Sequence, residues 1–501
     1  MILENSDNLS RYYAESLVLL FFPGSKFPED SSLDTDKINV RVTAQVKNGE
    51  FCGEAFIHDE SGKEASAEYV VPGSVAEGKS EEMCLKLASG GAMLKAGEAF
   101  TGTLPPWGML TGVRPAKMAA EIMKGGADAD KTARILCETF LCKPEKAKLA
   151  ALTAKTESVY VNDRARGECS VYIAIPFCPS KCSYCSFVSF TSERLLSLIP
   201  QYLTALAVDI RDKFNIISEL GLRVSTVYIG GGTPTVLSAP QLDFLLGTIA
   251  SCTDISALDE FTLEAGRPDT ITEEKLGIAA SYGVTRISVN TQTLNDDILR
   301  SIGRAHNAHD FLRAYEAAVR SGIRDINVDL IAGLPGESCE SFSDSLDRIC
   351  ELDPTNITVH TFYAKRAAEV VKNNKDIYRL ADIETVAAVE YSQKKIISAG
   401  YLPYYMYRQK NTVANLENVG YSKPGHEGIY NIMMMDEIHT VFGAGASAMT
   451  KLVSRDPSDM KIVRICEPKY PYEYLDGHDA ESGIAARKHL RSETEKFYSV
   501  Y

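Results

Sequence analysis

The order of apolar and polar residues changes in character along the chain, and each change marks a predicted domain. From Ile38 to Val46 apolar and polar side chains alternate, which is the period-two pattern of a half-buried strand. An Asn48-Gly49 turn ends this segment. The predicted strands lie at 38–46, 51–58 and about 65–71. Helical patterns follow near 78–97, 115–124, 129–141 and 144–157. Residues 1–160 are therefore predicted to form an N-terminal α+β domain with an antiparallel meander.

Strands and helices alternate from residue 168 to 365. Nearly continuous apolar runs, typical of strands covered on both faces, lie at 171–177, 226–230, 260–265, 286–291, 325–331 and 356–362. Helical patterns lie between them, at 193–219, 238–250, 272–282, 309–321 and 338–351. This alternation predicts parallel strands with crossover helices. Six such units predict an α/β fold with a partial (β/α)6 barrel, and functional sites at the carboxyl ends of its strands.

Residues 366–501 mix both patterns and are predicted to form a C-terminal α+β cap that closes the barrel over a bulky substrate. Helical patterns lie at about 380–399 and 480–499. Strand-like segments lie at 403–408, 428–435, 438–442 and 462–466.

Charge and composition limit the classes of function. The 501 residues carry a formal net charge of −14, which argues against a general nucleic-acid binder. The first residues are acidic and lack the basic segment of a signal peptide, and no apolar run is long enough to span a bilayer. Twelve cysteines without a secretion signal predict a protein of the reducing cytoplasm.

One segment of the N-terminal domain is unusual in composition. Residues 105–115 contain Trp107, the only tryptophan, together with Arg114 between turn-forming residues. We expect this segment to dock onto the next domain, with contact to the substrate as the alternative.

Three cysteines follow the first barrel strand in one short loop. Cys178, Cys182 and Cys185 are spaced C-x3-C-x2-C, so their thiolates can converge on one inorganic centre. A four-iron cluster needs four ligands, and three local cysteines leave one iron open to a ligand that is not protein. A zinc site is the alternative, but no histidine lies nearby to complete it. A disulfide is less favoured, because clustered cysteines without a secretory signal usually indicate metal or redox chemistry.

Glycine-rich and polar segments recur at the ends of the other strands. They are 230–235, Glu264, 288–293, Arg304 and 327–336. Three glycines let a ligand approach bare backbone, although a tight turn explains such a run equally well. A carboxylate in the otherwise apolar strand at 260–265 needs a cation or a hydroxyl as partner. We interpret the regular recurrence of these groups as a ligand site along one edge of the barrel.

Together these motifs resemble the oxygen-independent coproporphyrinogen III dehydrogenase family of radical S-adenosylmethionine (SAM) enzymes. The resemblance covers about residues 168–450, and the segments 407–411 and 416–425 are similar to its HemZ-like subtype. It implies a [4Fe-4S] cluster on Cys178, Cys182 and Cys185, which with Tyr172 would be the catalytic residues. It implies contacts to a first SAM from Tyr172, Gly231 and Glu264. Contacts to a second SAM are implied for Tyr184, Gly232, Thr233, Gln292, Arg304, Asp329 and Ala364.

Two positions depart from the pattern of the family. The family has a further cysteine where this chain has Phe187, and a histidine where it has Ala174. The ending C-x-F is shared with HemW-type haem chaperones. The resemblance therefore leaves two functions open: a dehydrogenase, and a chaperone that binds and delivers haem. A radical enzyme for another large substrate is a third.

For the dehydrogenase, the resemblance implies a 5′-deoxyadenosyl radical that converts two propionates of coproporphyrinogen III to the vinyls of protoporphyrinogen IX in haem biosynthesis. It implies a low-potential electron donor such as flavodoxin or ferredoxin, and we expect a monomer. A tetracarboxylate substrate needs basic residues. The candidates are Lys365, Arg366, Arg267, Arg408 and Lys410.

Overall fold

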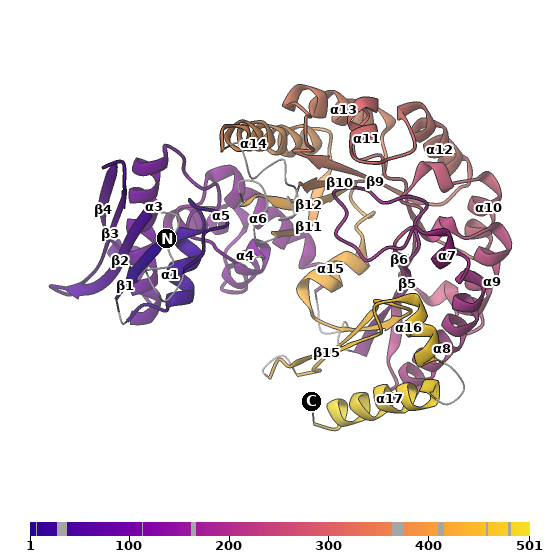
Figure 1. Cartoon of the computed structure of the whole chain (residues 1–501). Helices are drawn as coiled ribbons and strands as arrows, with labels where there is room; N and C mark the ends of the chain where they lie inside the picture. The colour runs from indigo at the N-terminus through magenta and orange to yellow at the C-terminus, as the bar shows by residue number, and fades with distance from the viewer. Residues whose placement is uncertain are drawn as a thin grey trace. The chain divides into compact units, whose positions relative to one another are not determined.

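The computed structural model divides the chain into two compact units. One comprises Met1–Lys155 and Met406–Glu417, and the other comprises Thr156–Tyr405 and Asn418–Tyr501. Figure 1 follows the chain through both. The residues described are 1–6, 8–27, 38–112, 114–161, 167–362, 375–408, 415–456, 459–478 and 482–500, without the side chains of 375–382 and 482–487. The predicted domain boundaries at 160 and 365 stay predictions.

The first unit contains a four-stranded sheet in the order β1-β2-β3-β4. The strands are β1 (Ile2–Asn5), β2 (Ile38–Lys47), β3 (Glu50–Asp59) and β4 (Glu64–Val70). β2, β3 and β4 form the predicted antiparallel meander, whereas β1 was not predicted and pairs parallel to β2. The helices are α1 (Arg11–Val18), α2 (Gly73–Ala76), α3 (Glu81–Thr101), α4 (Pro115–Lys124), α5 (Ala129–Phe140) and α6 (Pro144–Glu157).

A buried ion pair holds the segment around Trp107 in the first unit. Trp107 Nε1 donates to one carboxylate oxygen of Glu417 at 2.7 Å, and Lys146 Nζ donates to the other at 2.5 Å. The side chains of Lys146 and Glu417 are each only 1% exposed. Arg408 donates to the carbonyl of Leu110 and lies over the Trp107 ring. Glu417 and Arg408, about 300 positions later in the chain, thus fix the segment together with Lys146.

The second unit contains most of a sheet of eleven strands in the order β11-β12-β10-β9-β8-β7-β6-β5-β13-β14-β15. The six predicted barrel strands are β5 (Glu168–Ile175), β6 (Arg223–Gly231), β7 (Glu260–Glu264), β8 (Arg286–Ser288), β9 (Asp325–Ala332) and β10 (Asn356–Thr361). Each pairs in parallel with the next. The prediction of a partial (β/α)6 barrel is therefore confirmed.

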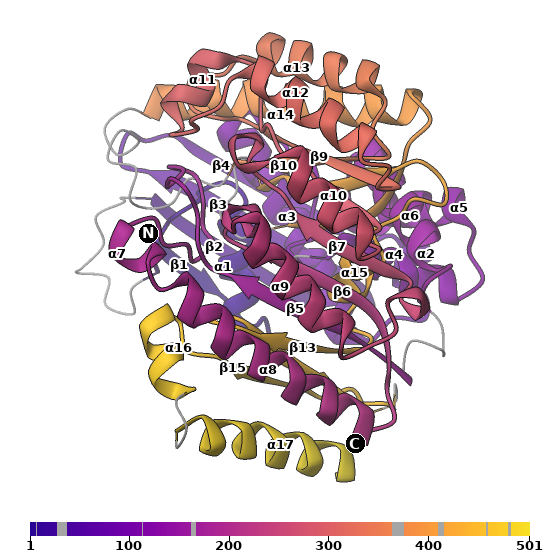
Figure 2. The same ribbon diagram turned by 90° about the vertical axis from the view of Figure 1, so that its right-hand side faces the viewer.

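Helices cover the outer face of this curved sheet, as Figures 1 and 2 show. They are α7 (Glu193–Leu196), α8 (Ile199–Glu219), α9 (Ala239–Ala250), α10 (Glu273–Ser281), α11 (Asp296–Ser301), α12 (Ala308–Arg320), α13 (Cys339–Leu352) and α14 (Lys375–Ser398). Among the residues described, no helix is both long and apolar enough to cross a membrane.

The C-terminal region extends the barrel sheet at both edges. β12 (Glu417–Ser422) pairs antiparallel with β10, and β13 (Thr440–Ala444) pairs parallel with β5. The remaining elements are β11 (Leu402–Arg408), β14 (Met449–Val453), β15 (Ile462–Cys466), α16 (Pro471–Gly477) and α17 (Ser482–Val500). The prediction of a strand at 428–435 was wrong, because the segment forms α15 (Ile429–Asp436). Three consecutive methionines there favour a helix over a strand.

A buried polar network links the start of α15 to the amino-terminal end of the barrel. Arg286 on β8 donates to Asn356 on β10 and forms ion pairs with Glu260 and Asp325. Glu260 in turn accepts a hydrogen bond from the backbone N–H of Ile429 at 2.7 Å. These contacts fix α15 against the barrel strands.

The buried pair in the first unit can be tested by removing one charge. Lys146→Met leaves the Glu417 carboxylate buried without its ammonium partner, so we expect the free energy of unfolding to fall by about 3–5 kcal/mol. Because Trp107 is the only tryptophan and lies in this unit, its fluorescence in urea reports the unfolding there. Lys47→Met removes an exposed pair with Glu54 and should lower the free energy of unfolding far less, because water screens that pair. Equal losses in both variants would contradict the prediction.

Candidate active site

The cysteine loop begins where β5 ends and is fixed by backbone hydrogen bonds. The N–H of Cys178 donates to the carbonyl of Phe190 at 3.0 Å, and the N–H of Phe190 donates to Pro176 at 2.9 Å. Further along, the N–H of Ser183 donates to Ile302 at 3.0 Å. The three cysteines therefore lie at the carboxyl end of the parallel strands, which is the end where functional sites gather on this fold.

The three thiols lie in a shared polar environment. Cys178 and Cys182 are each 8% exposed, and Cys185 is partly buried. Cys178 Sγ lies 3.3 Å from Thr233 Oγ1, and Cys182 Sγ accepts a hydrogen bond of 3.3 Å from Arg267. Burial raises the pKa of the Cys178 thiol, against the lowering effect of the Thr233 hydrogen bond, and Cys185 adds to the rise.

This arrangement fits an iron–sulfur cluster. Across the described residues, no three cysteine, histidine or acidic side chains are grouped as ligands of a single metal ion would be. A cluster does not require that geometry, since each thiolate binds a different iron atom. Three partly buried thiols on one loop, with hydroxyl and guanidinium donors at their sulfurs, match the surroundings of a cluster bound by cysteine.

The glycine segment after β6 lies directly against the cysteine loop. Gly231 has a φ of +110°, which L side chains rarely adopt. The N–H groups of Gly232 and Thr233 donate to the carbonyls of Ile175 and Phe177, both at 2.8 Å. A Cβ atom on Gly232 would lie 2.5 Å from the Phe177 carbonyl oxygen. The glycines are thus required for packing of the loop, whether or not a ligand contacts them.

Three tyrosines and Glu264 form a cluster inside the barrel. Tyr172 on β5 stacks on Tyr228 of β6, with ring centroids 6.1 Å apart, and on Tyr430 of α15 at 6.3 Å. The hydroxyl of Tyr228 donates to Glu264 at the end of β7. Burial raises the pKa of Glu264 to about 7, and Asp329 adds to this effect, while the bonds from Tyr228 and Gly231 oppose it. The carboxyl is poised to change its charge near neutral pH.

Arg304 joins the cysteine loop to two strand ends. Its guanidinium donates to the Tyr184 hydroxyl at 2.7 and 3.1 Å, and to the carbonyls of Gly266 and Asn290 at 3.0 and 2.9 Å. Tyr184 immediately precedes Cys185. The arginine is buried, so these four bonds position the loop relative to β7 and β8.

Asp329 and Gln292 meet at the ends of β8 and β9. Asp329 accepts hydrogen bonds of 2.7 Å from the side-chain amides of Asn290 and Asn327. Burial would raise its pKa, but the His360 ring, 3.8 Å away, and the hydrogen bond from Asn327 outweigh burial and lower it. Gln292 has a φ of +76°, and its N–H donates to the carbonyl of Asp329 at 3.0 Å. The fold therefore brings the predicted SAM residues Gln292, Arg304 and Asp329 to one end of the barrel.

The predicted substrate residues are placed differently. Arg267 is bonded to the cysteine loop, and Arg408 belongs to the first unit. The other three substrate candidates lie outside the described residues: Lys365, Arg366 and Lys410. Ala364 of the predicted SAM set also lies outside them. A role of any of them in substrate binding stays a prediction.

Sequence reasoning missed Tyr228, Tyr430 and Asn290. Tyr228 stands directly opposite Tyr172 in the strand register, so strand alternation could have placed it on the same face. Asn290 lies within a segment already noted for its polar residues. No sequence signal pointed to Tyr430, which reaches the cluster from α15, nearly 170 residues after Glu264.

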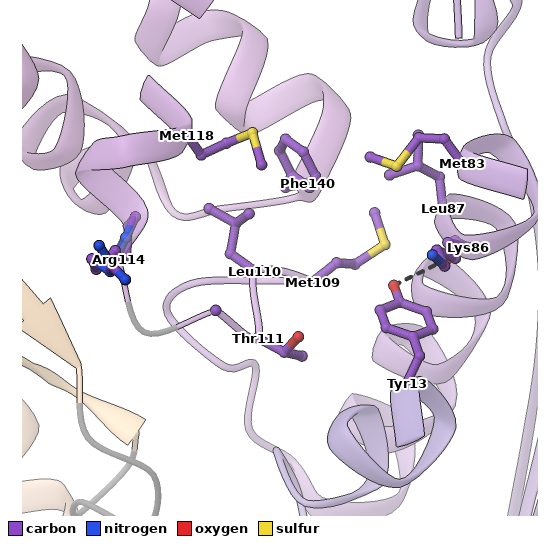
Figure 3. A pocket seen from close by; sticks show the side chains of 12 residues that line it. Tyr13, Met83, Lys86, Leu87, Met109, Leu110, Thr111, Arg114, Met118 and Phe140 are labelled. Carbon is purple, nitrogen blue, oxygen red and sulfur yellow. Dashed lines mark hydrogen bonds between the residues drawn. The ribbon is translucent and has the colours of Figure 1, made fainter. Parts of the chain in front are cut away.

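A separate cavity lies in the first unit (Figure 3). Its volume is about 210 Å³, and three methionines, Met83, Met109 and Met118, contribute to its wall with Leu87 and Phe140. None of the predicted cluster or SAM residues lines it.

Comparison with known proteins shows which families this chain resembles. The model of the radical SAM superfamily matches residues 172–349. The oxygen-independent coproporphyrinogen-III oxidase-like protein HemZ of Bacillus subtilis is 39% identical over 385 residues, 75% of either chain. The haem chaperone HemW of B. subtilis is 31% identical over 309 residues, 60% of this chain and 77% of the relative. The structure of coproporphyrinogen III oxidase (HemN) from Escherichia coli, a radical SAM enzyme, aligns with a TM-score of 0.46 at 22% identity, covering 60% of this chain and 70% of HemN.

The cysteine loop on a partial barrel and the matched model define a member of the radical SAM superfamily, whose members use a [4Fe-4S] cluster and SAM. Within it, the chain belongs to the family of oxygen-independent coproporphyrinogen-III oxidase-like proteins that includes HemZ.

The close approach at Gly232 can be tested with one methyl group. In Gly232→Ala the new Cβ meets the backbone of Phe177, so we expect the free energy of unfolding to fall by about 1–3 kcal/mol and the bound iron to decrease. Urea unfolding followed by circular dichroism and an iron assay measure both effects. In Gly277→Ala, on the surface of α10, the Cβ meets no atom within 4 Å, and stability should rise by about 0.5–1 kcal/mol. Unchanged stability and iron in Gly232→Ala would contradict this account.

Proposed function

We propose that the protein catalyses the oxygen-independent oxidative decarboxylation of coproporphyrinogen III to protoporphyrinogen IX. The observation that carries the proposal is the 39% identity to coproporphyrinogen-III oxidase-like HemZ over three quarters of both chains. The cysteine loop at the carboxyl end of the barrel supports it, because a radical reaction needs a cluster beside a cavity that excludes water.

Cys178, Cys182 and Cys185 are the proposed ligands of the [4Fe-4S] cluster. A cluster held there would supply the one electron that splits bound SAM into methionine and a 5′-deoxyadenosyl radical, the species that would take a hydrogen atom from a substrate propionate. The residues of the chain hold and orient these groups. Thr233 and Arg267 contact two of the three sulfurs, and the Phe190 carbonyl holds the loop through the N–H of Cys178.

The tyrosine cluster and the strand ends form the proposed SAM site. Glu264 is a suitable partner for the ammonium of a first SAM, because a buried carboxylate gains from a cation. Tyr172 supplies an aromatic surface beside it. Gly231 exposes backbone there. Residues of a second SAM site would be Tyr184, Gly232, Thr233, Gln292, Arg304 and Asp329.

The substrate carboxylates need cations that are free to bind them. Arg267 and Arg408 already bond to groups within the chain. We therefore favour Lys365 and Arg366, four and five residues after the end of β10, with Lys410 next. A flavodoxin or ferredoxin would donate the electron, and the proposed state is a monomer in the cytoplasm.

A second function, haem delivery, is favoured by specific observations. The haem chaperone HemW of B. subtilis is 31% identical to this chain over 77% of its own length. Phe187, two residues after the last cysteine, gives this chain the C-x-F ending of the HemW-type chaperones. Its side chain is 72% exposed, so the core of the fold does not require it. Against this function, two histidines of the C-terminal region are engaged: His439 bonds to Ser170 at 2.8 Å, and His426 bonds to Asp325 at 2.5 Å.

An anaerobic assay distinguishes the two functions. Reconstituted protein, SAM, a low-potential reductant and coproporphyrinogen III should yield protoporphyrin in step with 5′-deoxyadenosine. Replacement of Cys178, Cys182 and Cys185 together by alanine should abolish both products and the visible absorption of the cluster. Deoxyadenosine without protoporphyrin would refute the dehydrogenase and leave haem delivery or another substrate.

The pH dependence of SAM binding tests the role of Glu264. The pKa of about 7 means that the neutral carboxylic acid predominates below pH 7 in the empty site. Binding a cationic ammonium requires the ionised form, so the affinity for SAM should rise by about fivefold from pH 6 to pH 7. Isothermal calorimetry measures this. Glu264→Gln should bind SAM more weakly and lose the dependence, whereas Glu273→Gln, on exposed α10, should retain it. The same pH dependence in Glu264→Gln would rule out this role.

A further inference from the structure

A buried arginine that was not among the predicted cluster or SAM residues lies against the cysteine loop. Arg267, just after β7, is 3% exposed. Its Nη1 donates to Cys182 Sγ at 3.3 Å and its Nη2 donates to Ser180 Oγ at 2.8 Å. Asp269 accepts from Nε at 3.1 Å and from Nη2 at 3.4 Å. One guanidinium thus bonds to a sulfur and to a carboxylate at the same time.

The positive charge of Arg267 beside the Cys182 sulfur does not depend on pH. A guanidinium keeps its proton in proteins, so the donor at Cys182 is a full cation. Reduction adds one negative charge to a cluster, and hydrogen bonds to its sulfurs are among the factors that set the reduction potential. A cation at a ligand sulfur stabilises the reduced form and raises the potential. Asp269 partly offsets this effect through its opposite charge.

His306 lies beside the ion pair of Arg267 and Asp269. It is buried, its Nδ1 lies 3.9 Å from Asp269 Oδ1, and in the part of the chain described neither ring nitrogen has a hydrogen-bond partner. Burial, and next the charge of Arg304, lower the pKa of His306 to about 4. At neutral pH the ring therefore adds no positive charge beside Asp269.

We propose that Arg267 is a positioning residue that raises the reduction potential of the cluster through its hydrogen bond to Cys182, and that Asp269 limits this rise. The proposal rests on the proposed binding of a cluster by Cys178, Cys182 and Cys185. It gives Arg267 a role different from the contact with substrate carboxylates that the sequence predicted. Two variants should shift the potential in opposite directions, which a purely structural role would not do.

The experiment is an anaerobic redox titration of the full-length holoprotein, followed by electron paramagnetic resonance of the reduced cluster. Arg267→Gln keeps a donor but removes the charge, and should lower the equilibrium constant for reduction by a factor of about 3 to 10, the upper value equal to 59 mV for one electron. Asp269→Asn should raise it by a smaller factor. Arg320→Gln removes an exposed arginine on α12, paired with Glu273, and should leave it unchanged.

Iron and sulfide content separate the outcomes. If the wild-type protein binds no cluster, the proposed function itself fails and the role of Arg267 fails with it. If the wild-type protein binds a cluster, equal potentials in Arg267→Gln, Asp269→Asn and Arg320→Gln overturn the role of Arg267 alone. If Arg267→Gln loses its iron, the reduction potentials of Asp269→Asn and Arg267→Lys test the proposal in its place. An unshifted potential in Asp269→Asn, or a potential in Arg267→Lys far below that of wild type despite its retained charge, overturns the proposal.

Discussion

The contact between the cysteine loop and the glycine segment of β6 is the constraint on which the site depends. Two N–H groups, from Gly232 and Thr233, donate to the strand and loop that carry Cys178. The backbones approach so closely that even a Cβ atom has no room at Gly232. This contact brings Thr233 to the sulfur of Cys178 and directs the loop across the strand ends. The positions of Arg267 and Arg304 follow, since both bond to the same loop.

Much of the barrel could be predicted from sequence because its signals are local. Six apolar runs alternate with helical patterns, and the cysteine loop and the glycines each lie within a few residues of a strand end. What could not be predicted depends on distant partners. β1 pairs with β2 over a gap of more than thirty residues, and Tyr430 reaches Tyr172 only because α15 folds against the barrel. The sequence 428–435 reads as apolar, and an apolar run of that length does not distinguish a strand from a helix.

The same limit applies within the site. Arg267 follows a strand and looks like a surface cap or a substrate contact when only its neighbours are considered. Its partner Cys182 lies 85 residues earlier, so the bond becomes visible only once β5 and β7 lie in one sheet. Gln292 is a similar case, because no neighbouring residue in the sequence predicts the left-handed backbone conformation that Gln292 adopts. Sequence predicted which residue types gather at the strand ends, and the fold determines which of them are already engaged.

Charge in the barrel interior restricts how a substrate can bind there. Glu264 and Asp329 are acidic, which suits a sulfonium and an ammonium group. The proposed substrate, a tetracarboxylate, would be repelled by the same two groups. The described arginines Arg267 and Arg304 at this end already bond to groups of the protein. Carboxylates facing away from the reaction therefore need cations elsewhere, and the pair Lys365-Arg366 follows β10 closely in sequence. In the proposed reaction a propionate would enter this acidic interior, so its own charge would oppose the approach, and binding of cationic SAM beforehand would reduce that cost. For the proposed substrate this favours an order in which SAM binds before the porphyrinogen.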